Sequence, residues 1–336
     1  MLTPMFAADF GPYLLEEIVA ELGLVRVVRA SRQQTSDPLL VHVLRSSLKG
    51  SEASLREFRR RQRSADILSG HPRSWKLSDV GTMAGDPYFV LSGWPGVSLA
   101  KFSGSADGKL DSSTVPENLP RPAVSDWVIR NWLSDLAGVV DFAHQNGIIL
   151  GNISPYSIWI SDDGSASLMD PGAEGEIPWQ LETPDAINAT PFIERASYLA
   201  PEQLLGWTIG PHTDVYALGA VLHWLLGGRY ARSRCADAAT IGRYFPLLPP
   251  QKGVNEGLAA ICVKATALAP SSRFGSAQIL RAALLATAED MLMARKRALA
   301  AGRTTVVFGL NNERERREAS IMPRTRLGRW LHGWKE

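Results

Sequence analysis

The sequence predicts an α+β protein with two lobes, a small β-rich N-terminal lobe and a larger, mainly helical C-terminal lobe. β-branched residues cluster in the first 92 residues. Apolar residues recur at helical spacing after residue 124. A stretch rich in Ser, Gly, Pro and Asp at 103–123 lies between the two regions and predicts a loop insertion. The chain of 336 residues is long enough for two lobes with tails.

Runs of β-branched and apolar residues predict the strands of the first lobe. They indicate two strands within 13–30 and single strands at Leu39–Arg45, Trp75–Val80 and Tyr88–Ser92. Ser31–Pro38 is expected to be a turn. One helix is predicted over 51–68, with a basic side formed by Arg59, Arg60, Arg61 and Arg63.

Helical periodicity predicts most of the second lobe. Helices are expected over 124–146, 213–227, 256–268 and 276–300. The helix at 213–227 is apolar nearly all round, which is typical of a helix at the centre of a core. Short strands are expected at Ile148–Leu150, Ile158–Ile160 and Ala166–Met169. Residues 171–199 show no periodicity and are expected to form a loop.

These elements divide the chain into five parts. They are an N-terminal segment (1–12), the first lobe (13–92), a hinge with an insertion (93–123), the second lobe (124–290), and the end of the C-terminal helix with a basic, Trp-containing tail (291–336). Within 324–334, Leu327, Trp330, Leu331 and Trp334 form a helical stripe beside arginines. The alternatives are a loosely ordered tail and a segment that docks on a partner groove or an anionic membrane surface.

Composition narrows the classes of function. A formal net charge of +2 gives no overall reason to expect nucleic acid as a partner. Cys235 and Cys262 form neither a disulfide framework nor a metal cluster, and are expected to be core thiols in a reducing compartment. The N-terminus lacks the basic segment of a signal peptide, and no apolar run is long enough to cross a membrane. A soluble, cytoplasmic protein is expected.

The order of elements and three motifs together resemble a eukaryotic-type Ser/Thr protein kinase of the bacterial kind, over about residues 13–290. Ala200–Glu202 looks like the Ala-Pro-Glu that closes the activation segment. Asp214 and the residues after it are similar to the start of the family's central helix, and Arg273 matches a late arginine. The resemblance implies a two-lobed protein-kinase-like fold, a salt bridge between Glu202 and Arg273, and a role for Asp214 in holding the catalytic loop.

By the same resemblance, the nucleotide site is degenerate. Three glycines of the phosphate-covering loop are replaced, by Ala20, Leu22 and Val25. The strand lysine becomes His42, and the helix glutamate falls at Arg61, or at Gln62 if the register slips by one. A neutral histidine lacks the charge of lysine, and arginine reverses the charge of glutamate, so the Lys–Glu pair is expected to be lost.

The catalytic loop also departs from the family pattern. Asn152 stands at the position of the catalytic aspartate and cannot accept a proton at neutral pH. Ser154 replaces a lysine, and Ser157 replaces the Mg²⁺-binding asparagine with a weaker ligand. Asp170, before Pro171 and Gly172, is the one metal-ligand carboxylate left.

Three hypotheses follow. The first is a pseudokinase that needs no cofactor and acts as a signalling scaffold or regulator, bound to a protein such as an active Ser/Thr kinase or a phosphopeptide reader. The second is a divergent Ser/Thr protein kinase that uses ATP and Mg²⁺. The third, compatible with both, is a phosphorylation target. Its candidate sites, which are otherwise ordinary loop residues, are Thr183, Thr190, Thr304 and Thr305.

Overall fold

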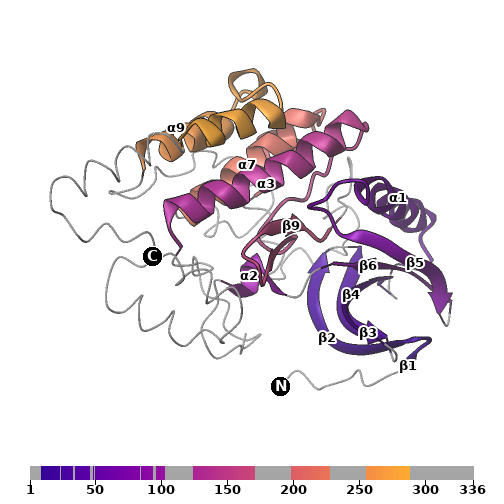
Figure 1. The fold of residues 1–336 in the computed structure, drawn as a ribbon. Coiled ribbons are helices and arrows are strands. Elements are labelled where there is room, and N and C mark those ends of the chain that lie inside the picture. Colours follow the sequence, from indigo (N-terminus) through magenta and orange to yellow (C-terminus); the bar gives the residue numbers. More distant parts are fainter. Residues whose placement is uncertain are drawn as a thin grey trace, which may run out of the picture.

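The computed structural model of the chain describes residues 9–22, 24–32, 35–45, 48, 50–83, 85–93, 96–102, 124–170, 198–227 and 255–287. These residues form two lobes (Figure 1). A curved antiparallel sheet with one helix makes the N-terminal lobe, and helices with a small sheet make the C-terminal lobe. The predicted two-lobed α+β architecture is therefore confirmed.

The N-terminal sheet has six strands in the order β1-β2-β3-β4-β6-β5. Its strands are β1 (Asp9–Phe10), β2 (Tyr13–Leu22), β3 (Val25–Arg32), β4 (Thr35–Leu44), β5 (Lys76–Met83) and β6 (Asp86–Ser92). Apolar side chains project from both faces of this sheet. In β3, Val25 and Val27 join one apolar cluster, and Val28 joins a second cluster. Both faces of the sheet therefore carry core residues.

The turn predicted at Ser31–Pro38 is shorter than expected. β3 continues to Arg32, β4 begins at Thr35, and these two residues pair with each other. Pairing of β4 with β6 starts only at Leu39, which lies opposite Ser92, the last residue of β6. The polar residues between the predicted strands therefore extend the hairpin.

Helix α1 (Glu52–Leu68) covers the sheet beside β5. Ser51 caps its N-terminus, where the Ser51 hydroxyl accepts a hydrogen bond from Ser54 N at 3.2 Å. Lys76 donates to the carbonyls of Ser69 and His71 just after the helix, which satisfies acceptors at its C-terminal end. The helix buries Phe58, Ala65 and Leu68.

The C-terminal lobe is built around α7 (Pro211–Leu225), whose residues from Thr213 to Leu225 are all buried. The predicted central helix is thus confirmed. Around it are α3 (Asp126–Gln145), α6 (Pro201–Leu204), α9 (Glu256–Ala265), the 3₁₀ turn η4 (Pro270–Ser272) and a helical stretch at 277–287. Figure 1 shows α3, α7 and α9 side by side, and α7 contacts both of the others.

A small sheet lies between the lobes, formed by β7 (Gly96–Ser98), β8 (Ile158–Ser161) and β9 (Ala166–Leu168). The short helix α2 (Leu99–Phe102) follows β7 directly. The strand predicted at Ile148–Leu150 is wrong: these residues form no strand. The amide of Leu150 instead donates to the Asp214 carboxylate at 2.9 Å, so a side chain takes the hydrogen bond that a strand partner would otherwise accept.

Several sequence predictions lie outside the described residues. They are the insertion at 103–123, the loop at 171–197, Cys235, the tail at 291–336 and all four candidate threonines. Cys262 is buried, as expected of a core thiol, and burial raises its pKa to about 12. In the parts of the chain placed by the structure, no helix combines the length and the apolar character needed to span a membrane.

Candidate functional site

Three residues predicted as parts of the degenerate site meet between the lobes. Arg61 points inward from α1, and its Nη1 lies 3.2 Å from Asp170 Oδ1. Asn152 donates from Nδ2 to the other oxygen of Asp170, at 2.9 Å. The side chains of Arg61 and Asp170 are only 4% and 1% exposed. Both oxygens of the remaining carboxylate therefore have protein partners, and one partner is a buried cation.

The choice between Arg61 and Gln62 is resolved by burial, because Arg61 is buried and Gln62 is only half-buried. A second buried carboxylate lies near the same guanidinium, since Glu57 Oε1 is 4.0 Å from Arg61 Nε. Glu57 also pairs with Arg60 at 2.7 Å. The inner face of α1 thus carries both signs of charge, with Arg61 the group that reaches across to the C-terminal lobe.

His42 is fully buried in β4. Its ring stacks on Phe89 with centroids 4.5 Å apart and planes 15° apart. Burial lowers the pKa of His42 to about 4; the Asp170 carboxylate opposes this shift and the Arg61 guanidinium adds to it. His42 is consequently neutral at pH 7 and cannot replace the positive charge of a lysine.

Ser157 is held inside the catalytic loop. Its Oγ lies 3.0 Å from the carbonyl oxygens of Asn152 and Ser154, to either of which it can donate, and it accepts from Ser154 N at 2.9 Å. These bonds fix the loop but occupy the oxygen that was predicted as a weak metal ligand. No group of three or more His, Cys, Asp or Glu side chains capable of holding a metal occurs among the described residues.

The loop predicted to lack its three glycines is the connection of β2 and β3. The side chains of Ala20 and Leu22 lie outside what the structure describes, although their backbone pairs with β3. Val25 is fully buried and belongs to an apolar cluster together with Leu24 and Val27. The side chain at the third glycine position therefore serves the core of the N-terminal lobe.

That apolar cluster also crosses between the lobes, which the sequence did not reveal. Trp159 of β8 and Met169 pack with Trp75 and Leu40 from the first lobe, and all four are buried. The two indoles meet edge to face at 5.3 Å, and Trp75 Nε1 donates to Ser167 Oγ at 3.2 Å. Large aromatic side chains thus fill space where the two lobes meet. Both tryptophans lie in predicted strands. Their large apolar side chains were the only indication in the sequence that these two positions are buried.

Asp214 anchors the catalytic loop to the central helix. Its carboxylate accepts hydrogen bonds from Leu150 N at 2.9 Å and from Gly151 N at 2.7 Å. His144 Nε2 lies 2.8 Å from the same carboxylate. Gly151 has φ of +66°, a conformation that glycine adopts without strain. The loop that holds Asn152 is therefore fixed by its backbone, whatever chemistry its side chains can perform.

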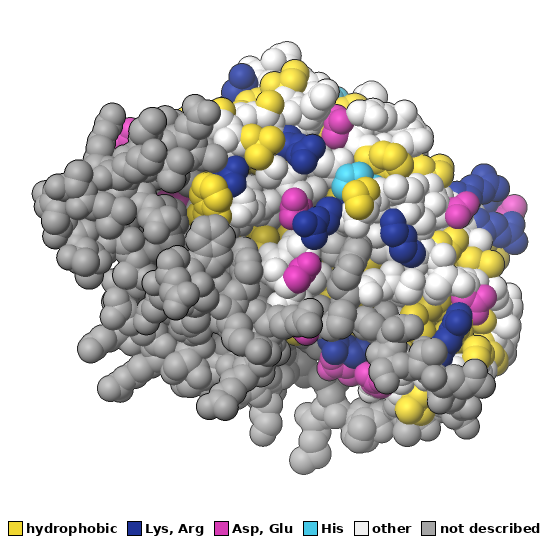
Figure 2. Space-filling view, in the orientation of Figure 1, with side chains coloured by type: hydrophobic (Ala, Val, Ile, Leu, Met, Phe, Trp, Pro, Cys, Tyr) yellow, Lys and Arg dark blue, Asp and Glu magenta, His cyan; other side chains and the backbone are white. Residues whose placement is uncertain are grey.

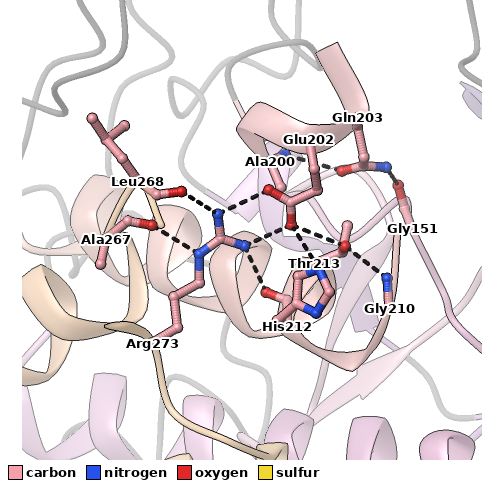
Figure 3. A network of polar contacts seen from close by, with 10 residues as sticks. All are labelled: Gly151, Ala200, Glu202, Gln203, Gly210, His212, Thr213, Ala267, Leu268 and Arg273. Carbon is pink, nitrogen blue, oxygen red and sulfur yellow. Dashed lines mark hydrogen bonds and ion pairs between the residues drawn. The ribbon is translucent and has the colours of Figure 1, made fainter. Parts of the chain in front are cut away.

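Glu202 and Arg273 form the ion pair that the family resemblance implies. Arg273 Nη1 and Nη2 lie 2.6 and 2.8 Å from the two carboxylate oxygens of Glu202, and both side chains are almost fully buried. Figure 3 shows the guanidinium reaching three backbone carbonyls as well, those of Ala267, His212 and Leu268. Burial alone would raise the pKa of Glu202, but the Arg273 hydrogen bonds bring it below its usual value.

The same ion pair is linked to the catalytic loop through α6. Gln203, next to Glu202, donates from Nε2 to Gly151 O at 2.8 Å and accepts from Ala200 N at 2.9 Å. Thr213 donates to Glu202 at 3.0 Å. Hydrogen bonds therefore run from Arg273 through α6 to the residue before Asn152.

Bacterial kinases are similar to this chain in sequence. The Ser/Thr-protein kinase PknB of Mycobacterium leprae is 30% identical over 294 residues, which cover 85% of this chain and 44% of that protein. The Ser/Thr-protein kinase PrkC of Bacillus subtilis is 25% identical over 283 residues, covering 81% of this chain and 40% of that protein. The chain thus spans less than half the length of these curated relatives. No protein-family model matches it.

Solved kinase domains share the fold. The PknI kinase domain of Mycobacterium tuberculosis matches with a TM-score of 0.54 at 19% identity. The match covers 86% of this chain and 100% of that domain. The chain therefore has the two-lobed fold of protein kinases. With the sequence relatives, the chain belongs to the superfamily of eukaryotic-type Ser/Thr protein kinases of bacteria.

Proposed function

We propose that this kinase-like chain does not transfer phosphate and acts as a signalling scaffold or regulator. The observation that carries the proposal is the buried contact of 3.2 Å between Arg61 and Asp170. In active kinases the corresponding aspartate holds Mg²⁺, and a lysine–glutamate pair positions the phosphates. Here a guanidinium already neutralises that carboxylate, and the lysine position holds a neutral histidine.

The described residues do not fit a Mg²⁺–ATP complex. A magnesium ion needs oxygen ligands that are open to it, usually one or two carboxylates together with phosphates and water. Asp170 is bound on both oxygens, by Arg61 and Asn152, and the Ser157 hydroxyl is bonded within its own loop. Asn152 is an amide and so supplies no general base. No step of phosphoryl transfer follows from this arrangement.

Thermal-shift measurements with ATP, with and without Mg²⁺, test this proposal. A ligand that binds the folded state raises the melting temperature, and the stabilisation grows with the logarithm of the ligand concentration relative to Kd. We expect no shift at millimolar ATP for the wild-type chain. A clear Mg²⁺-dependent shift, lost in Asp170→Ala but kept in the surface variant Asp66→Ala, would overturn the proposal.

An active but divergent Ser/Thr protein kinase is the second candidate. It is favoured by the intact contacts of Asp214, Glu202 and Arg273 and by the names of the sequence relatives. In that case ATP and Mg²⁺ would be required. Incubation with labelled ATP and a general protein substrate separates the candidates, because only the active enzyme labels the substrate.

The proposal extends to partners and location. A scaffold of this class would bind a protein, such as an active Ser/Thr kinase or a phosphopeptide reader. Membrane contact through 324–334 and phosphorylation of the four candidate threonines rest on the sequence alone. A cytoplasmic location belongs to the same proposal.

A further inference from the structure

The run of arginines in α1 is divided by the fold into two groups. Arg61 faces inward to Asp170, and Arg60 pairs with the buried Glu57 at 2.7 Å. Arg59 and Arg63 are exposed and have no hydrogen bond or ion pair with any described residue. With about 100° of rotation per residue, Arg59 and Arg63 lie one turn apart on one face of the helix, roughly opposite Arg61.

Other charged residues share this outer face. Arg56 is 67% exposed and lies 3.3 Å from Glu52, itself 86% exposed, so this pair is a weak surface contact. Asp66 is exposed near the other end of the helix. The face therefore carries three arginines in its middle and one carboxylate towards each end. Figure 2 shows dark-blue side chains gathered at the edge of the molecule over α1, with magenta beside them.

We infer that this outer face of α1, defined by Glu52, Arg56, Arg59, Arg63 and Asp66, binds an acidic segment of a protein partner. The three guanidiniums complement a short run of carboxylates, and guanidinium forms strong paired hydrogen bonds with carboxylate. Glu52 and Asp66 complement basic residues at the two ends of that segment. The alternation of charge thus fixes the position of the partner as well as attracting it.

Other occupants fit this face less well. The basic stretch from Arg56 to Arg63 is only about 10 Å long at 1.5 Å per residue. A membrane or a nucleic acid extends its negative charge well beyond this length, and would meet Glu52 and Asp66 with repulsion. A second copy of α1 packed antiparallel about its middle would oppose Arg56 to Arg63, which costs energy. A short acidic segment avoids both problems.

The inference rests on the proposed function in one respect, because a scaffold needs a partner surface and α1 supplies it. The helix that presents this surface is also held by the Arg61–Asp170 pair on its inner side. The position of the surface is consequently fixed without nucleotide. Binding of the partner is expected to be the same with and without ATP and Mg²⁺.

Fluorescence anisotropy at low salt tests the surface with a defined probe. The probe is a short labelled peptide with glutamates in its centre and a lysine at each end. We expect it to bind the wild-type chain, and the double variant Arg59→Glu/Arg63→Glu to bind it about tenfold more weakly, equivalent to about 1.4 kcal/mol. The matched control Lys264→Glu/Arg281→Glu changes the net charge equally at two exposed positions of other helices, and should bind as the wild type does.

Three results would overturn the inference: no binding of the peptide, equal loss in the control variant, or tighter binding to phosphatidylserine vesicles or single-stranded DNA than to the peptide. Both replaced arginines are exposed, so the melting temperature should change little and folding should not confuse the result. The outcome is independent of the ATP measurements. ATP binding would contradict the proposed function but not the binding surface on α1. A failed peptide test would contradict the binding surface but not the proposed function.

Discussion

Arg61 and Asp170, 109 residues apart in the chain, form a buried ion pair that joins α1 to the loop after β9. By the family resemblance, Asp170 stands where an active kinase holds a metal ion, and the guanidinium of Arg61 lies beside its carboxylate. The pair also fixes α1 against the C-terminal lobe. Arg61, at the position where the family resemblance places a glutamate, thus pairs with a carboxylate of the C-terminal lobe.

Removal of the Arg61 side chain should destabilise the fold strongly. Arg61→Ala removes the cation beside the buried carboxylate of Asp170, and breaking a buried pair on one side costs about 3–5 kcal/mol. The matched control Arg56→Ala removes an exposed pair and should cost less than about 0.5 kcal/mol. Urea denaturation of both variants provides the comparison. Equal losses would show that the buried pair contributes nothing special.

Arg273 should not tolerate lysine. The guanidinium makes two contacts with Glu202 and three with backbone carbonyls, a planar set of donors that one ammonium group cannot reproduce. We expect Arg273→Lys to lose about 2–4 kcal/mol of unfolding free energy. Arg281→Lys, at an exposed position, is the control and should be neutral. A stable Arg273→Lys protein would contradict the network in Figure 3.

Restoring the family residues tests how much of the site has been lost. His42→Lys together with Arg61→Glu re-creates the lysine–glutamate pair and removes the cation beside Asp170. We expect the double variant to gain a small Mg²⁺-dependent thermal shift with ATP, whereas each single variant places an uncompensated charge in the core and loses stability. If the double variant melted at a lower temperature than both single variants, the two introduced charges would not compensate each other and the prediction would be wrong.

Sequence patterns predicted the two lobes and the central helix, because helical and strand periodicity are local properties. The residues of the candidate site came from the family resemblance instead. They left open whether Arg61 or Gln62 faces inward, although the neighbours Glu57, Phe58 and Ala65 are buried at helical spacing. The partner of Arg61 could not be predicted, since it depends on how α1 packs against a distant loop. Proximity of Arg61 and Asp170 follows only from the tertiary structure.

Two other features show the same limit. The apolar run Ile148–Leu150 has the pattern of a strand, but the Asp214 carboxylate accepts hydrogen bonds from the amides of Leu150 and Gly151. Only the folded chain places that carboxylate there. Trp75 and Trp159 each fit a strand pattern, yet nothing in either segment shows that the two indoles meet between the lobes. Local sequence patterns cannot predict contacts between elements that are far apart in the sequence.

His42 should make stability depend on acidity. Its pKa is about 4 in the folded protein against 6.5 in the unfolded chain, so between these values the unfolded state binds more protons. The contribution of His42 to the free energy of unfolding is therefore fully present above pH 6.5. It is lost as the pH drops towards 4, which lowers the free energy of unfolding by up to about 3 kcal/mol. His42→Leu should remove this part of the pH dependence. Denaturation curves at several pH values compare the slopes; parallel slopes for wild type and variant would refute the assignment.

Trp159 should act as a filler between the lobes. Trp159→Ala removes a buried indole that packs with Trp75, Met169 and Leu40, and such a change typically costs about 3–5 kcal/mol. The cavity is lined mainly by apolar groups, so it should bind a small aromatic molecule. We expect free indole to raise the melting temperature of the variant but not of the wild type. Trp207→Ala, at a side chain that is 60% exposed, is the control and should neither melt early nor respond to indole. If indole stabilised neither protein, or the wild type as well, the space between the lobes would not be filled as the structure shows.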